Sequence, residues 1–135
     1  MVVTTDVGHP TDVHPRNKKS VGERFASLAL NDIYGFRKGG RSPEPVRAER
    51  RGNLVVITFR HSGSLKTSDG LPVREVEVSV SGNDFKPASA RIRRNRLEVD
   101  AAGAVSVRYG WNPVSDGNLT GESGLPVATF RLKIN

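Results

Sequence analysis

Cysteine is absent from this chain of 135 residues. Without a thiol, the chain cannot form disulfides, zinc–thiolate sites, iron–sulfur clusters or a cysteine nucleophile. No apolar run approaches the ~18 residues that a membrane-spanning helix needs. The N-terminus lacks the basic stretch and following apolar stretch that mark a secretory signal. We therefore expect neither a transmembrane segment nor a signal peptide in this chain, and its compartment stays undetermined.

Aromatic residues are also scarce, at 6%, whereas charged residues make up 26% and the net charge is +7. A basic chain of this kind raises nucleic acid or another anionic surface as a partner. The densest cluster comprises Arg91, Arg93, Arg94 and Arg96, and no aromatic residue lies among them to stack on bases. We interpret the cluster as a solvated strand face and hairpin, and we expect no nucleic-acid partner and no membrane partner.

The first 35 residues predict a loop followed by one helix. Gly8, Pro10 and Pro15 exclude regular structure from most of residues 1–15, and Pro15 also suits a first helical position. Gly35 is expected to end the helix. Apolar residues then recur on one helical face: Val21, Phe25, Leu28 and Ala29. Further apolar residues widen this stripe: Ala26, Leu30, Ile33 and Tyr34. Such a wide stripe predicts a packing partner larger than a small sheet.

The rest of the chain predicts a linker and a small antiparallel β-sandwich. The stretch "GFRKGGRSPEP" is rich in glycine, proline and charge, as linkers are. Beyond it the apolar period becomes two, with Val76, Val78 and Val80 in one strand and Val105, Val107 and Tyr109 in another. Turn residues separate such runs at hairpin-like intervals. The predicted fold is therefore mainly β, with an N-terminal loop and one helix. We expect three parts: residues 1–36, a linker at 37–45 and the sandwich at 46–135.

The opening loop contains residues suited to acid–base chemistry. His14 directly precedes the predicted helix, and a carboxylate that fixes one nitrogen of its ring would leave the other as a general base for a serine hydroxyl. Asp12 and Asp6 are the available carboxylates. Two alternatives use the same residues: Asp12 and His14 could merely cap the helix, or a metal could bind these residues together with His9. The metal alternative is disfavoured because proline follows both histidines and their spacing is not the helical i, i+4.

A resemblance adds to this interpretation. The stretch "TTDVGHPTDVHPRNKKSVGERFASLALNDIYG" resembles the C-terminal block of SGNH-type hydrolases, in the form found in the sialate O-acetylesterase family. The segments "VRYGWNP" and "GLPVATFR" are similar to the β-rich region that follows that block. The resemblance implies that residues 1–36 are the tail of an α/β hydrolase domain and that His14 is the catalytic base. It also implies deacetylation of an O-acetylated carbohydrate by a serine nucleophile, without cofactor or metal, in a periplasmic or secreted parent protein.

This sequence departs from the family pattern in two ways. The family's aspartate stands three residues before the histidine, where this chain has Thr11, so Asp12 is the first candidate for the orienting acid and Asp6 the second. The family's nucleophile lies in a Gly-x-Ser block that the chain lacks, and Ser64 and Ser123 do not stand in a nucleophile elbow. We therefore expect the C-terminal part of an esterase, inactive alone, whose partner is a missing N-terminal hydrolase segment.

A non-catalytic module that binds carbohydrate or another partner is the alternative function. Trp111 and Tyr109, beside Asn112, Asn118 and Asp116, could form an exposed aromatic and amide patch for a sugar. Tyr109 and Trp111 also continue the face of Val105 and Val107 at a spacing of two residues. That periodicity predicts instead that both rings belong to the sandwich core.

Overall fold

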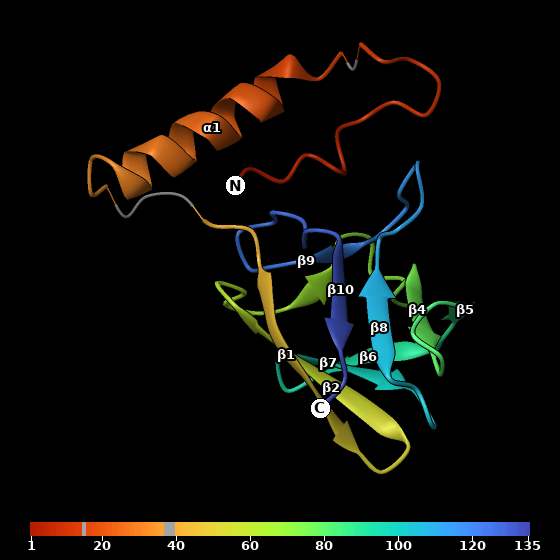
Figure 1. The fold of residues 1–135 in the computed structure, drawn as a ribbon. Coiled ribbons are helices and arrows are strands. Elements are labelled where there is room, and N and C mark those ends of the chain that lie inside the picture. The colour runs from red at the N-terminus through yellow and green to blue at the C-terminus, as the bar shows by residue number, and fades with distance from the viewer. Residues whose placement is uncertain (15, 37–39) are drawn as a thin grey trace.

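The computed structural model describes residues 1–14, 16–36 and 40–135, and it confirms a mainly β fold with one helix and antiparallel sheets (Figure 1). The elements of these described residues follow one another in this order: α1 (Lys18–Asp32), β1 (Glu44–Arg51), β2 (Leu54–Arg60), β3 (Lys66–Thr67), β4 (Val76–Ser79), β5 (Lys86–Pro87), β6 (Ala90–Arg93), β7 (Arg96–Asp100), β8 (Ser106–Tyr109), β9 (Leu119–Thr120) and β10 (Phe130–Lys133). Of the expected linker, residues 37–39 lie outside the described residues, and Glu44 and Pro45 already belong to β1.

Two four-stranded antiparallel sheets share one core. Their strand orders are β1-β2-β7-β6 and β10-β8-β4-β5, and β3 and β9 form a further short pair. Ile57 and Leu97 from the first sheet and Val107 and Tyr109 from the second belong to one cluster of buried side chains. Burial of these apolar side chains from both sheets is the main contribution to the stability of the β-domain.

The predicted alternation is followed only in part, since Ser79 and Ser106 are buried along with the apolar face. Val76 and Val107 are buried as predicted, whereas Val80 and Val105 are exposed. The reason is that β4 ends at Ser79 and β8 begins at Ser106. Outside a strand, successive side chains no longer alternate between two faces.

Helix α1 has a clear cap at each end. Its N-cap is Asn17, whose side-chain oxygen accepts the backbone N–H of Ser20 at 3.1 Å. At the other end Gly35 has φ +69°, and the N–H of Phe36 donates to Leu30 O at 2.9 Å. Gly35 thus ends the helix as predicted, whereas the helix begins at Lys18 rather than at Pro15, which lies outside the described residues. No helix in the described chain is long and apolar enough to cross a membrane.

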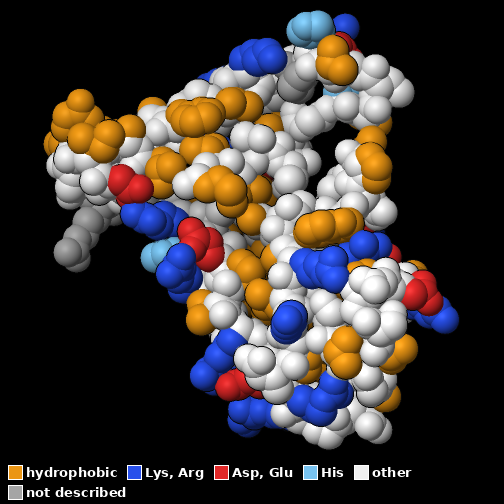
Figure 2. Space-filling model, in the orientation of Figure 1, with side chains coloured by type: hydrophobic (Ala, Val, Ile, Leu, Met, Phe, Trp, Pro, Cys, Tyr) orange, Lys and Arg blue, Asp and Glu red, His pale blue; other side chains and the backbone are white. Residues whose placement is uncertain are grey.

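A mixed polar and apolar face of the helix lies toward the rest of the molecule. The half-buried side chains of this face are Ser20, Val21, Arg24, Ser27, Leu28, Ala29 and Asn31. Apolar side chains on and after the helix are exposed instead: Phe25, Leu30, Ile33, Tyr34 and Phe36, with Ile33 at 74%. Figure 2 shows hydrophobic side chains gathered over α1. The described chain therefore covers Val21, Leu28 and Ala29 in part and leaves the remaining large apolar side chains of the stripe exposed.

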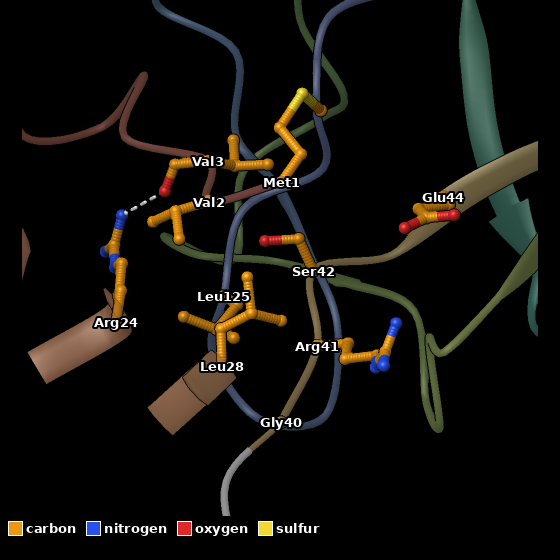
Figure 3. A pocket seen from close by; sticks show the side chains of 10 residues that line it. All are labelled: Met1, Val2, Val3, Arg24, Leu28, Gly40, Arg41, Ser42, Glu44 and Leu125. Atoms are coloured by element: carbon orange, nitrogen blue, oxygen red, sulfur yellow. Dashed lines mark hydrogen bonds between the residues drawn. The ribbon is translucent and has the colours of Figure 1, made fainter. Parts of the chain in front are cut away.

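The N-terminal residues lie between α1 and the β-domain. Val3 is buried, and it lines one pocket together with Leu28 of the helix and Leu125 of the β-domain (Figure 3). A Cβ on Gly40 would lie 2.2 Å from the Cβ of Ser123, so only glycine permits this close approach. These contacts attach the loop and helix to the sandwich.

Candidate functional site

The structure brings together His14 and Asp12. The Asp12 Oδ1 atom accepts the backbone N–H of His14 at 2.8 Å and lies 3.7 Å from His14 Nδ1. The His14 side chain is 87% exposed. At 3.7 Å the two side chains are close but not hydrogen-bonded. The pair faces open solvent at the edge of the molecule.

His9 organises the loop that carries this pair. Its Nδ1 atom accepts the backbone N–H groups of Thr11 at 3.3 Å and Asp12 at 3.1 Å. An Nδ1 atom that accepts hydrogen bonds carries no proton, so the neutral ring has its proton on Nε2. His9 therefore has a structural role, because its hydrogen bonds fix the backbone of the loop at Asp12.

Asp6 is committed to a different partner. Its carboxylate receives two hydrogen bonds from Arg24 of α1, at 2.6 and 2.7 Å, and Arg24 also donates to Val3 O at 2.9 Å. The hydrogen bond with Asp6, more than the opposing effect of burial, raises the pKa of Arg24 above its ordinary value. The structure thus places the second candidate acid on the helix rather than on His14. No local pattern predicts this role of Arg24, which lies 18 residues from its partner.

The described residues show no metal cage and no nucleophile beside the histidines. Within residues 1–14, 16–36 and 40–135, no three His, Cys, Asp or Glu side chains are arranged to hold a metal ion. Ser64 and Ser123 are both exposed in the β-domain, and Ser123 faces α1 across a hollow lined also by Ser20 and Ser27. Neither serine makes a hydrogen bond to a histidine in the described chain.

A cleft separates the His9 loop from a loop of the β-domain. One wall is formed by Thr5, Asp6, Gly8, His9 and Pro10, and the other by Ser68, Arg74 and residues 113–117. In Figure 1 the long loop after β8 rises toward the N-terminal loop. A molecule bound in this cleft would therefore touch both the His9 loop and the β-domain.

The β-domain wall of this cleft is held in place by Glu75. Its backbone has φ +56°, a conformation that costs free energy for a residue with a side chain. Its carboxylate accepts hydrogen bonds from Asn112 Nδ2 at 2.9 Å, Ser115 Oγ at 2.6 Å and the N–H of Asp116 at 2.8 Å. Burial alone would raise the pKa of Glu75, but these hydrogen bonds lower it overall. The loop after β8 is therefore anchored at three points.

Two of the polar residues in the predicted sugar-binding patch have structural roles instead. Asn118 is buried, and its amide donates to Asp69 Oδ1 and Pro72 O, both at 3.0 Å. Arg74 forms ion pairs with both Asp69 and Asp116. The hydrogen bond from Arg74, followed in size by that from Asn118, lowers the pKa of Asp69 to about 2. Asn118 is thus not available to a sugar, and Asp116 is already paired.

The two aromatic residues separate. Tyr109 is buried as predicted, and burial raises its pKa to about 12. Trp111, predicted to lie in the core, is 48% exposed. Strand β8 ends at Tyr109, and Gly110 follows with φ +64°, so the two-residue period does not extend to Trp111. The exposed indole belongs to the surface.

Comparison with known proteins shows a likeness to a solved structure. The sequence matches no family model and no curated protein. It is similar to the crystal structure of XAC1771, a novel carbohydrate acetylesterase from Xanthomonas citri, with 37% identity over 96% of this chain and a TM-score of 0.89. The match covers 31% of the XAC1771 chain, so this chain spans about a third of that protein's length. In sequence and in fold, the chain is related to a carbohydrate acetylesterase.

Proposed function

We propose that this chain is the histidine-bearing C-terminal part of a carbohydrate O-acetylesterase, of the SGNH type found in sialate O-acetylesterases. The observation that carries the proposal is the 37% identity with a carbohydrate acetylesterase over 96% of the chain. The exposed His14, with Asp12 close to its Nδ1 atom, is the acid–base group that such an enzyme needs. The substrate would be an O-acetylated carbohydrate.

His14 would act as the general base. A serine of the remaining hydrolase segment attacks the acetyl carbonyl while His14 Nε2 takes the hydroxyl proton. The tetrahedral intermediate then releases the sugar hydroxyl, which receives that proton from His14. Water attacks the acyl-serine, again losing a proton to His14, and acetate leaves as the proton returns to the serine.

Asp12 is the better candidate for the orienting acid. Its Oδ1 atom lies 3.7 Å from His14 Nδ1, so a small rotation of either side chain would form a hydrogen bond. Asp6, the second candidate, has both carboxylate oxygens on Arg24. We assign Asp6 a positioning role, because it ties the loop to α1.

The apolar face of α1 supports a division of the chain into two functional parts. Ile33 is 74% exposed and Phe25 is 59% exposed, which is unfavourable for a helix that remains in water. We propose that the remaining hydrolase segment covers this face, so that residues 1–36 complete a catalytic domain. Residues 37–45 would then connect it to an accessory sandwich at residues 46–135.

Hydrolysis of an aryl acetate tests this proposal. The purified chain is assayed alone and together with the hydrolase segment of an esterase of this type, supplied as a separate polypeptide. We expect no activity from the chain alone, and activity on complementation that His14→Ala abolishes. His61→Asn is the matched control, because His61 is an exposed histidine of the β-domain whose φ of +59° asparagine tolerates.

Two results would contradict the proposal. Activity of the chain alone that depends on His14 would mean that the nucleophile lies within these 135 residues. Equal loss of activity in His14→Ala and His61→Asn would mean that neither histidine acts as the base.

A further inference from the structure

The outer face of the second sheet carries a row of charged side chains. Arg131 of β10 is the register partner of Arg108 of β8, and Arg108 is the partner of Glu77 of β4. Figure 1 shows β10 beside β8. Their neighbours in sequence, Phe130, Tyr109 and Val76, are buried in the core, so the charged row faces outward.

Arg108 holds two aromatic rings at this surface. Its guanidinium carbon lies 4.2 Å from the ring centre of Phe85 and 5.9 Å from that of Trp111. Its charge is matched by Glu77, which accepts hydrogen bonds from Nε at 2.7 Å and Nη2 at 3.1 Å. Because Glu77 neutralises Arg108, the contribution of Arg108 is to fix the rings by cation–π contacts. The exposed Trp111 indole is thereby held as a flat platform.

Arg131 and Lys133 provide positive charge that nothing in the described chain neutralises. Arg131 stacks 5.0 Å from the Phe85 ring centre and donates to Gly82 O. Neither cation forms an ion pair with any residue that the structure describes. Both line a hollow, together with Ser81, Gly82, Val105 and Ser106. A hollow with two unmatched cations is complementary to a carboxylate.

The platform is next in sequence to the loop that forms one wall of the cleft beside the His9 loop. Trp111 directly precedes Asn112, whose side chain bonds Glu75, and residues 113–117 of the same loop form the β-domain wall of the cleft. A glycan chain that left the cleft along this loop would therefore pass over Trp111.

We propose that this outer face binds an acidic oligosaccharide, with Trp111 stacked on one sugar ring and with Arg131 and Lys133 on the carboxylate of another. The inference rests on the proposed function for its link to the cleft, and it narrows the substrate class to glycans that contain acidic sugars. The aromatic ring and the cations bind different groups of the ligand. An aromatic ring packs on the apolar face of a sugar, and a guanidinium group binds a carboxylate.

The emission of Trp111 reports binding directly, because it is the chain's one tryptophan. The purified chain is titrated with an oligomer of galacturonic acid, with the neutral galactose oligomer of equal length, and with duplex DNA. We expect the acidic oligomer to change the emission saturably and to bind at least about fivefold more tightly than the neutral one.

Charge-removing variants locate the site. Arg131→Gln and Lys133→Gln should each weaken binding of the acidic oligomer by about fivefold or more, with the chain still folded by thermal melting. Arg93→Gln is the matched control, because it removes the same charge from the basic cluster on the other sheet and should leave affinity within about twofold. Trp111→Ala, followed by affinity electrophoresis, should also weaken binding by about fivefold.

Four results would overturn the inference. These are no emission change with the acidic oligomer, equal affinity for the neutral oligomer, equal affinity for duplex DNA, and equal weakening by Arg93→Gln and Arg131→Gln. An aryl acetate has no sugar, so its hydrolysis depends on His14 but not on this surface. Failure of the binding experiment is therefore distinguishable from failure of the proposed esterase function.

Discussion

The contact between Arg24 and Asp6 should control how firmly the histidine loop is held against α1. Arg24→Met removes two short hydrogen bonds to the Asp6 carboxylate and one to Val3 O. The Arg24 side chain is only 14% exposed and that of Asp6 is 37% exposed, so the pair lies between an exposed and a buried ion pair. We expect a loss of about 1–2 kcal/mol in the free energy that docks the loop.

Native-state hydrogen exchange measures this loss by region. A change of 1–2 kcal/mol corresponds to amide exchange that is faster by roughly 5–30-fold in residues 1–14. Amides of the core strands β2 and β7 should keep their protection. Arg16→Met is the control, because Arg16 is exposed and makes no ion pair within the described residues.

A double-mutant cycle with Asp6→Asn isolates the pair. The reasoning is refuted if the two substitutions are additive, or if exchange rises equally in the loop and in the sandwich. Either result would mean that the loop is held by something other than this ion pair.

Three further substitutions test the fold. Gly40→Ala should destabilise the chain by about 1–3 kcal/mol in urea denaturation, because the new Cβ would overlap a facing serine side chain. Leu97→Ala, at a fully buried position, should cost about 2–5 kcal/mol. Asp69 stabilises the folded state above its ordinary pKa of 3.8, and this contribution is lost as pH falls toward the folded-state value of about 2. Asp69→Asn should therefore lower stability at neutral pH, and the difference from the wild type should shrink toward pH 2.

Each of these predictions has a control or a contrary result. Gly22→Ala meets nothing within 4 Å and should stabilise the exposed helix by about 0.5–1 kcal/mol, so a loss like that of Gly40→Ala would contradict the steric argument. Leu71→Ala, at an exposed position, should change stability by less than about 0.5 kcal/mol. A pH-independent difference between Asp69→Asn and the wild type would contradict the depressed pKa.

Local patterns predicted the elements that local interactions form. The mainly β fold, the helix before Gly35 and the burial of Val76 and Val107 followed from periodicity within single segments. Val80, Val105 and Trp111 were misassigned because periodicity does not reveal where a strand ends. The left-handed backbone of Gly110, which separates Trp111 from β8, is set by the whole loop rather than by neighbouring residues.

In the candidate site too, contacts between near neighbours in sequence were predictable and long-range contacts were not. The proximity of Asp12 to His14 was predictable from a spacing of two residues. The commitment of Asp6 to Arg24 was not, because it depends on how the opening loop folds back along α1. Likewise, the anchoring of residues 112–116 by Glu75 spans about 40 positions, and no sequence pattern links residues so far apart. The catalytic roles of His14, Asp12 and Asp6 stay predictions.

Turnover by the reconstituted enzyme tests the central claim most directly. Acetate release from an acetylated carbohydrate is measured with wild-type chain and with His14→Ala, each combined with the complementing hydrolase segment. Our account predicts that kcat falls by several orders of magnitude in the variant, as it does when a triad base is removed. Near-normal turnover by His14→Ala would contradict the account, because the base would then have to lie elsewhere.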